Sequence, residues 1–413
     1  MTPTSTINSA NLKSQLKRAE RRHLIRSYNL ILPLFAFILI SFLIPLGIVF
    51  YNSIYDPQVA TGLPKTVESL KDWDVRSTPY PSENSFAALA AEMKTASDNQ
   101  TASGIASRLN YEGSGLRTLF MKTSREVEDV DDGPWQEKFI AIDKNWAQPE
   151  IWSVIRQTGS FYTSGYYLKA LDMQRDPFDN IEKQPADARI YIDVFARTLF
   201  ISGLVTVFCF LLGYPIAYLL SKLPARTSNL LMIFVLLPFW TSMLVRTTAW
   251  IVLLQKGGVI NSTLLSLGLI SEPLDLMFNR FGVVVAMTHI LLPFMILPLF
   301  SVMKSVPSTY VRAARSLGAS PWTAFWKIYF PQSMPGVSAG GLLVFILAIG
   351  YYITPTLLGG AGDQMISYFI ADNLSRSLNW GLASALGCIL LAGILVFYSF
   401  YEKYVGVSNV KLG

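Results

Sequence analysis

The chain has 413 residues, of which 51% are hydrophobic and only 15% are charged, and its formal net charge is +6. The charged residues are spread unevenly, and several stretches without Asp, Glu, Lys or Arg approach or exceed the roughly 20 residues that a helix needs to cross a bilayer. A soluble protein with buried helices would not contain six such stretches, so the composition argues against that class.

In chain order, the uncharged stretches predict six transmembrane helices and therefore an all-α membrane protein. They contain 29 residues between Arg26 and Asp56, 24 between Arg197 and Lys222, 19 between Arg226 and Arg246, 23 between Arg280 and Lys304, 35 between Lys327 and Asp363, and 25 between Arg376 and Glu402. We assign the first helix to residues 29–52 and the other five to a membrane core at 189–405. Residues 247–255 are too short to span alone, and they form either an interfacial helix on the outer side or a continuation of the third span.

The short loops predict the orientation in the membrane. With a cytoplasmic N-terminus, the inside segments hold fourteen Lys or Arg and two acids, whereas the short outside loops hold four cations and four acids. The positive-inside rule therefore places both termini, the basic segment 1–28 and the tail 406–413, in the cytoplasm. The cations of segment 1–28 border an apolar run, so we interpret them as topology anchors rather than as a nucleic-acid-binding arm. That run is long and no small-x-small site follows it, which argues against a cleavable secretory signal.

Residues 53–188 form a large insert between the first and second spans, on the extracytoplasmic side. They contain 14 Lys or Arg and 21 Asp or Glu, a net charge of −7, and they are numerous enough to build a small core. Amphipathic helices are predicted at 85–96 and within 143–157, the latter starting near Pro149. Trp135, Trp146 and Trp152 are candidate core residues. Both cysteines of the chain lie in predicted spans, so this domain folds without disulfides.

The insert offers no catalytic or metal-binding pattern. The acidic run 125–135 lacks the alternating carboxylate spacing of a calcium loop, so we interpret it as solvated. The only histidines are His23 and His289, both outside the insert, which removes the usual general base and zinc ligand. We therefore expect no catalytic residue and no metal site in this chain.

A basic loop at 304–335 separates two spans on the cytoplasmic side. Pro307 and Ser308 open a predicted helix with Ser308 as N-cap, and Gly318 ends it at a left-handed C-cap position. Ser320 and Pro321 start a second helix, which is predicted to stop at Pro331. The residues alone fit an interfacial connector and a docking element equally well.

The pattern of this loop resembles the EAA loop of ABC-importer permeases, in which the loop forms a coupling helix that docks into the ATPase subunit. The matching residues are Ala313, Ala314, Gly318, Ile328 and Pro331. Arg312 stands where the family has Glu, which reverses the charge and puts any ion pair made by that Glu in doubt. Phe330 replaces a family Leu.

Four further stretches resemble permeases of the spermidine/putrescine import type: residues 213–224, 236–250, 258–270 and 289–306. The resemblance implies a type I ABC-importer permease fold with six spans, located in the bacterial inner membrane. It covers residues 29–52 loosely and 190–405 well, and leaves the insert outside. Related permeases import sulfate, molybdate, thiamine or ferric iron, so those substrates remain alternatives to polyamines.

The partners follow from what the chain lacks and from the resemblance. No G-x-x-x-x-G-K-[ST] motif occurs, so ATP and Mg are expected in a separate ABC ATPase dimer and no cofactor in this chain. One EAA-like loop for two ATPase clefts implies a second permease subunit, identical or related. The resemblance adds a periplasmic substrate-binding protein, and the remaining partner is the lipid bilayer rather than a nucleic acid.

An ion-coupled secondary transporter is the competing class. Such carriers keep ionisable residues near the midplane, whereas no Asp or Glu lies inside the six predicted spans and Asp193 precedes the second. His289 is a candidate proton relay, although a lone histidine is more often a hydrogen-bonded packing residue. For a polyamine, the spans offer aromatic faces instead of carboxylates. The candidate substrate-pathway residues are Trp240, Arg246, Trp250, Tyr351 and Tyr352.

Overall fold

The computed structural model describes residues 19–21, 28–128, 130 and 133–405, so the predicted cytoplasmic tail 406–413 and most of segment 1–28 lie outside the described residues. Within these ranges, six helices are long and apolar enough to cross a membrane. They are Tyr28–Asn52, Tyr191–Lys222, Met243–Ser266, Arg280–Ser305, Pro321–Ile349 and Trp380–Lys403. The predicted all-α membrane fold with six spans is confirmed.

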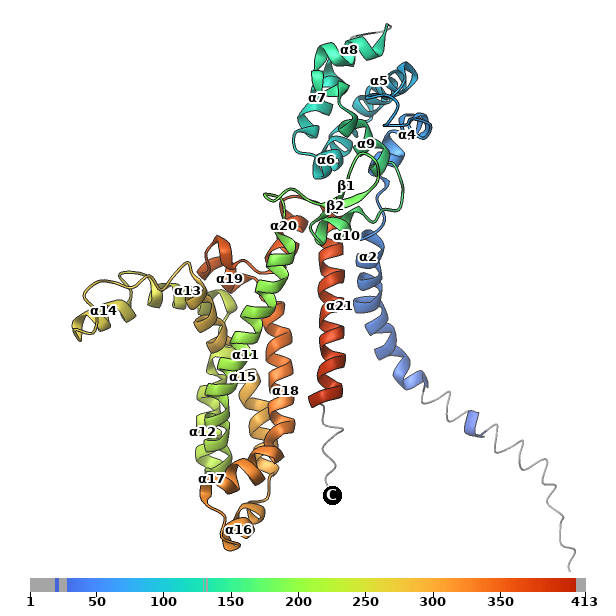
Figure 1. Ribbon diagram of the computed structural model, residues 1–413. Coiled ribbons are helices and arrows are strands. Elements are labelled where there is room, and N and C mark those ends of the chain that lie inside the picture. Colours follow the sequence, from blue (N-terminus) through green and yellow to red (C-terminus); the bar gives the residue numbers. More distant parts are fainter. Residues whose placement is uncertain (1–18, 22–27, 129, 131–132, 406–413) are drawn as a thin grey trace, which may run out of the picture.

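The centre of the membrane region is formed by three helices that pack along their lengths (Figure 1). These are α11 (Tyr191–Lys222), α15 (Arg280–Ser305) and α18 (Phe330–Ile349). Gly336 and Gly340 of α18 face α15 so closely that a Cβ would lie 3.1 Å from Leu299 Cα at the first and 3.0 Å from Met295 O at the second. Small residues spaced by four allow such backbone approach between membrane helices. Asp193, predicted to precede the second span, lies instead in the first turn of α11.

The third predicted span is wrong in its boundaries. The chain forms α12 (Ala225–Leu236) and the 3-10 turn η3 (Leu237–Trp240), breaks, and resumes as α13 (Met243–Leu254) and α14 (Val259–Ser266). Pro238 has no N–H for an α-helical bond, and Thr241 closes the turn by donating from Oγ1 to the Pro238 carbonyl at 2.8 Å. Residues 247–255 therefore belong to a separate helix rather than to a straight continuation, and Figure 1 shows α14 projecting sideways from the bundle.

The first and last spans lie together beside this centre. The helix Tyr28–Asn52 contains the π-helical turn η1 (Leu39–Leu43) and α2 (Ile44–Asn52), and α2 packs against α21 (Trp380–Val405) (Figure 1). No residue in the apolar window of the first span is buried within the chain. The segment between α18 and α21 contains α19 (Ile353–Leu358), η5 (Ala361–Asp363) and α20 (Ile366–Ser375).

Residues 53–190 form a mainly helical domain at one end of the bundle, which we call the α3–α10 domain (Figure 1). Its elements are α3 (Pro57–Gly62), α4 (Pro64–Ser69), α5 (Glu83–Asp98), α6 (Ala102–Glu112), α7 (Leu116–Glu128), α8 (Trp135–Ile142), η2 (Lys144–Ala147), α9 (Pro149–Thr158), α10 (Gly165–Ala170) and the antiparallel strands β1 (Met173–Arg175) and β2 (Ile181–Lys183). The helices predicted at 85–96 and from Pro149 are present as α5 and α9.

An aromatic cluster forms the core of this domain. Trp146 and Trp152 are fully buried, with ring centroids 5.4 Å apart, and each ring also contacts Phe86 or Phe139. Both indole N–H groups are satisfied, by Thr123 Oγ1 at 2.8 Å and by the Trp146 carbonyl at 2.9 Å. Of the three predicted core tryptophans, Trp135 is only partly buried, at the edge of the cluster.

Polar contacts join the α3–α10 domain to the ends of the spans. Asp172 accepts hydrogen bonds from the backbone N–H groups of Ile190, Tyr191 and Ile192, which caps α11. Arg108, which is 1% exposed, pairs with Asp56 just beyond the first span and donates to Glu112 at 2.8 Å. Burial alone lowers the pKa of Arg108, but the Glu112 and Asp56 carboxylates raise it above its ordinary value, so the guanidinium stays charged.

The buried Arg108–Asp56 pair allows a prediction of how much stability the α3–α10 domain loses when the cation is removed. Arg108→Met leaves the Asp56 carboxylate buried and unpaired, and we expect the α3–α10 domain to lose about 3–5 kcal/mol of stability. Hydrogen exchange of the α5–α9 amides in the full-length protein measures this loss. Lys71→Met is the control, because its ion pair with Glu68 is 63% and 72% exposed, and such pairs contribute about 0–1 kcal/mol. Equal losses in the two variants would contradict the structural role of the buried pair.

Candidate functional site

The candidate site is the loop between α15 and α18, at the end of the bundle opposite the α3–α10 domain (Figure 1). Its first helix, α16, covers Ser308–Ser316 and has no buried residue. The predicted N-cap is wrong by one position, because Pro307 occupies it and Ser308 is the first helical residue without a capping hydrogen bond. Pro307 fits there since its φ of −64° suits the helix start and its missing N–H has no partner to lose.

Gly318 ends α16 in the predicted left-handed conformation, with a φ of +89°. The Ala319 N–H donates to the Ala314 carbonyl and the Gly318 N–H to the Arg315 carbonyl, both at 3.0 Å, which is the Schellman pattern. No atom lies within 4 Å of the position that a Gly318 Cβ would take. Glycine is therefore required here for its backbone conformation and not for space.

The second predicted helix starts as expected but does not stop. The Ser320 Oγ accepts a hydrogen bond from the Thr323 N–H at 3.1 Å and α17 (Pro321–Ala324) follows. The chain then passes through the π-helical turn η4 (Phe325–Tyr329) into α18, so Pro331 lies in the first turn of α18 and inside the span Pro321–Ile349. The prediction that Pro331 ends the helix is wrong. The Phe330 N–H bonds five residues back to Phe325 O, and this wider turn admits the proline without ending the helix.

The structure divides the six proposed coupling residues into two groups. Arg312, Ala313 and Gly318 are exposed at the tip of the loop, where Ala314 is half-buried. Ile328 and Pro331 lie further along the chain, in η4 and α18, and do not belong to the exposed tip. The surface that a partner could meet is therefore α16 and its C-terminal turn.

An aromatic cluster that the sequence did not indicate fixes the loop to α11. The rings of Tyr218 and Tyr329 lie 5.1 Å apart, and Phe325 contacts Tyr214 and Tyr218 at 6.1 and 5.9 Å. The Lys222 Nζ lies 4.6 Å above the Tyr329 ring, within the range of a cation–π contact. More than one hundred residues separate the two halves of this cluster, so no local pattern reveals it.

Of the five candidate pathway residues, three form one group with His289 and the other two are exposed. The Trp250 Nε1–H donates to His289 Nδ1 at 3.2 Å, so that nitrogen is an acceptor and His289 is a hydrogen-bonded packing residue. Arg246 lies close enough to His289 and Tyr351 for its charge to act on both rings, and its buried Nε has no hydrogen-bond partner among the described residues. Trp240 and Tyr352 are instead 69% and 42% exposed.

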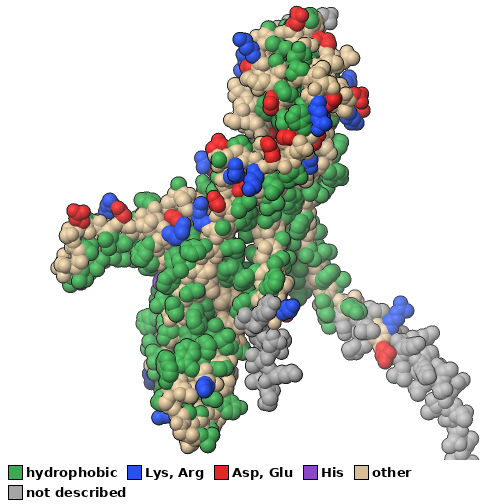
Figure 2. Space-filling model, in the orientation of Figure 1, with side chains coloured by type: hydrophobic (Ala, Val, Ile, Leu, Met, Phe, Trp, Pro, Cys, Tyr) green, Lys and Arg blue, Asp and Glu red, His purple; other side chains and the backbone are tan. Residues whose placement is uncertain are grey.

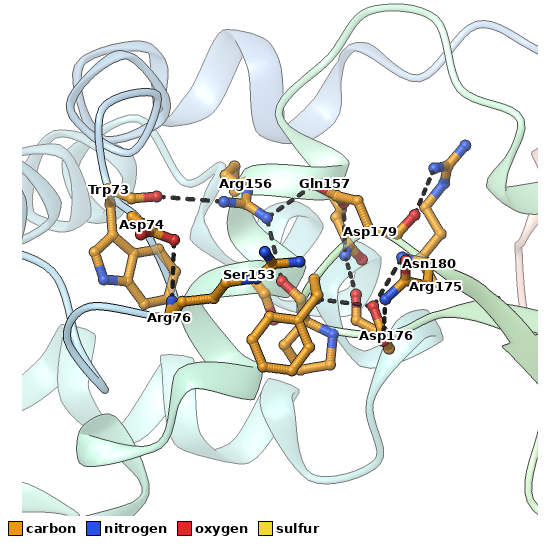
Figure 3. Close-up of polar contacts among 12 residues, drawn as sticks. Trp73, Asp74, Arg76, Ser153, Arg156, Gln157, Arg175, Asp176, Asp179 and Asn180 are labelled. Atoms are coloured by element: carbon orange, nitrogen blue, oxygen red, sulfur yellow. Dashed lines mark hydrogen bonds and ion pairs between the residues drawn. The ribbon is translucent and has the colours of Figure 1, made fainter.

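A polar cavity of about 510 Å³ in the α3–α10 domain does not form a second candidate site. Three of its four lining carboxylates are hydrogen-bonded, Glu112 with Arg108, Glu182 with Gln174, and Asp176 with Asn180, and the fourth, Glu150, is exposed. Figure 3 shows the edge of this cavity, where Gln157 donates to the Asp176 carbonyl at 2.8 Å. The Asn180 hydrogen bond lowers the pKa of Asp176, as expected for a satisfied carboxylate.

No metal centre is present in the described parts of the chain. Within them, no three or more His, Cys, Asp or Glu side chains converge as metal ligands would. The acidic run 125–135 is described only in part, because Asp129, Asp131 and Asp132 lie outside the described residues.

Comparison with known proteins identifies the class. Residues 210–405 match the family described as binding-protein-dependent transport system inner membrane component. The spermidine/putrescine transport system permease protein PotB of Haemophilus influenzae is 36% identical over 225 residues, which cover 54% of this chain and 79% of that protein. PotB of Escherichia coli K12 is 35% identical over 209 residues, covering 50% and 76%. A solved bacterial alginate ABC transporter is 18% identical with a TM-score of 0.44, over 52% of this chain and 79% of that one.

The chain therefore belongs to the family of inner membrane components of binding-protein-dependent transport systems. It is a multi-pass inner membrane protein and the permease subunit of an ABC importer, a transport component and not an enzyme. The family resemblance inferred from the sequence is confirmed.

A substitution at Gly318 tests whether the shape of the Schellman turn matters for transport. Gly318→Val places a β-branched residue in the left-handed region, which costs on the order of 1–2 kcal/mol and tilts α16 against α17. We expect faster amide exchange at the end of α16 and reduced transport by the assembled importer.

Gly115→Val is the matched control for this variant. Gly115 also has a φ of +89° and no atom within 4 Å of its Cβ position, but it lies in the α3–α10 domain. Both variants suffer the same backbone strain, so normal transport by an intact Gly318→Val protein would show that the shape of this turn does not matter.

Proposed function

We propose that this permease forms the translocation pathway of an ATP-driven importer of polyamines such as spermidine and putrescine. The observation that carries the proposal is the 35–36% identity to two permeases named for spermidine and putrescine transport, over about three quarters of their length. Importers of sulfate, molybdate, thiamine or ferric iron are the alternatives within the class.

The arrangement of the loops supports a definite orientation. The α16 end of the bundle contains Lys222, Arg226, Lys304 and the cations of α16, so the positive-inside rule places it in the cytoplasm together with both termini. There α16 docks onto one subunit of an ABC ATPase dimer, which supplies ATP and Mg. A second permease subunit fills the other cleft of that dimer.

The same orientation places the α3–α10 domain in the periplasm, at the opposite end of the bundle (Figure 1). Its net charge of −7 over residues 53–188 and its attachment to α11 through the Asp172 cap support a role at the outer mouth. We propose that it serves as an additional docking surface for the periplasmic substrate-binding protein.

The pathway holds its substrate weakly. Around Arg246, Trp250 and Tyr351 a polyamine meets aromatic faces, which contribute about 0.5–2 kcal/mol per cation–π contact, and one repelling cation. No Asp or Glu occurs between residues 194 and 271 or between 281 and 362, so these helices provide no carboxylate for an ammonium group. Selectivity therefore comes mainly from the binding protein.

Uptake measurements test this function. In cells without their own polyamine uptake, the permease expressed with its ATPase, second permease and binding protein should accumulate radiolabelled spermidine or putrescine. Uptake should require both the ATPase and the binding protein, because the chain has no nucleotide site and only a weak substrate site. Accumulation without the ATPase would indicate a secondary carrier. If sulfate, molybdate, thiamine or ferric iron competes for uptake and polyamines do not, the competing solute is the substrate.

A deletion tests the role of the α3–α10 domain. The Asp56 N–H bonds to Phe161 O at 2.9 Å and the Thr163 N–H to Ile54 O at 2.8 Å, so residues 161–163 return to the point where the chain enters the domain. Replacing residues 58–159 by a short Gly/Ser bridge, with Asp56→Asn to avoid an unpaired carboxylate, keeps the spans and the Asp172 cap. We expect ATPase assembly to persist and stimulation of ATP hydrolysis by the binding protein to be lost. Unchanged stimulation and uptake would rule out the docking role.

A further inference from the structure

The end of the bundle that includes α16 has an unbalanced charge. No Asp or Glu occurs between Asp193 and Glu272 or between Arg280 and Asp363, so the described parts of α11, α12 and α15–α18 at this end have no carboxylate. The cations there are Lys222, Arg226, Lys304, Arg312, Arg315 and Lys327. Figure 2 shows Lys and Arg side chains and no Asp or Glu on the visible face of this end.

Three of these six cations have a local explanation. Lys222 and Lys304 lie over aromatic rings of their own chain, at 4.6 Å from Tyr329 and 5.7 Å from Phe300. Arg315 lies in the last turn of α16, where a cation stabilises the helix dipole. Arg312 has no such role, since it is exposed in mid-helix and forms no ion pair with any described residue.

The surroundings of Arg312 favour a protein rather than lipid headgroups as the partner. Tyr310 on the same short helix and Leu317 at its C-cap are 54% and 89% exposed. Figure 1 shows α16 at the extreme tip of the loop, beyond the ends of α12 and α18. Exposed apolar side chains and a cation on different faces of one short segment, at the point furthest from the spans, fit a protein cleft with an apolar wall and an acidic wall.

We propose that α16 docks into an acidic cleft of the ATPase subunit, where Arg312 pairs with a carboxylate. The inference rests on the proposed docking of α16 and adds the charge of the partner surface. In the permeases that this loop resembles, a Glu stands at the position of Arg312, so the polarity of the contact is reversed here. Arg312 thereby excludes ATPases whose clefts are built for an acidic residue.

A charge reversal in the whole importer tests the proposal. Arg312→Glu should reduce the ATPase that co-purifies with the permease by about tenfold or more, because attraction becomes repulsion at a desolvated contact. Arg312→Lys keeps the charge and should retain most of the binding. Wild-type association should weaken as salt rises, since screening acts on the ion pair, whereas binding by Arg312→Gln should depend less on salt.

Arg226→Glu is the matched control, because Arg226 is exposed at the same end of the bundle but lies on α12. It changes the net charge equally and should leave ATPase association unchanged. Equal loss in Arg226→Glu and Arg312→Glu would overturn the specific contact, and so would wild-type binding by Arg312→Glu. Lysine substitution of the cleft carboxylates, one at a time, should yield one ATPase variant that restores binding to Arg312→Glu.

These outcomes are separate from those of the proposed function. If the wild-type permease binds no ATPase and supports no ATP-dependent uptake, the importer assignment fails. If the wild type binds and transports while Arg312→Glu does both normally, only the acidic cleft is wrong.

Discussion

The hydrocarbon core of a bilayer offers no hydrogen-bond partner to the backbone, and this constraint shapes the irregular features of this structure. Helices satisfy their own backbone, but prolines at the ends of membrane helices remove donors. Before Pro331 the chain widens into the π-helical turn η4, and around Pro238 it tightens into the 3-10 turn η3. The π-helical turn before Pro331 lets α17 continue into α18 as one helix. The 3-10 turn around Pro238 ends the helix that begins with α12. The continuity of the helix Pro321–Ile349 and the separate arm α13–α14 both follow from how these prolines are accommodated.

Features set by local chemistry could be predicted from the sequence. Uncharged length identified most of the spans, and the positions of proline and glycine identified the start of α9 and the left-handed turn at Gly318. The Ser320 cap is equally local, because the side chain bonds to a backbone N–H three residues away. Each of these features depends only on residues that are a few positions apart along the chain.

The features that could not be predicted depend on distant contacts or on small differences between turns. Pro331 is an ordinary stop signal, and only the wider η4 turn, packed through Tyr329 and Phe325 against α11, lets the helix continue. The grouping of Arg246, Trp250, His289 and Tyr351 requires α13, α15 and the end of α18 to meet in space. Trp240 is a further example, because its 69% exposure depends on where η3 directs the ring and not on its residue type.

Continuity of the helix Pro321–Ile349 connects the two candidate regions. Its first turns follow α16 and carry the ring contacts to α11, and its last residue precedes Gly350 and Tyr351, which lies near Arg246. At 1.5 Å per residue, its 29 residues span about 43 Å. Gly336 and Gly340 hold the same helix tightly against α15, which carries His289. The loop that contains α16 and the region around Arg246 and Tyr351 are therefore joined by one packed helix. The first span packs against α21 and the α3–α10 domain contacts α21 through α10, whereas the Asp172 cap joins that domain to α11.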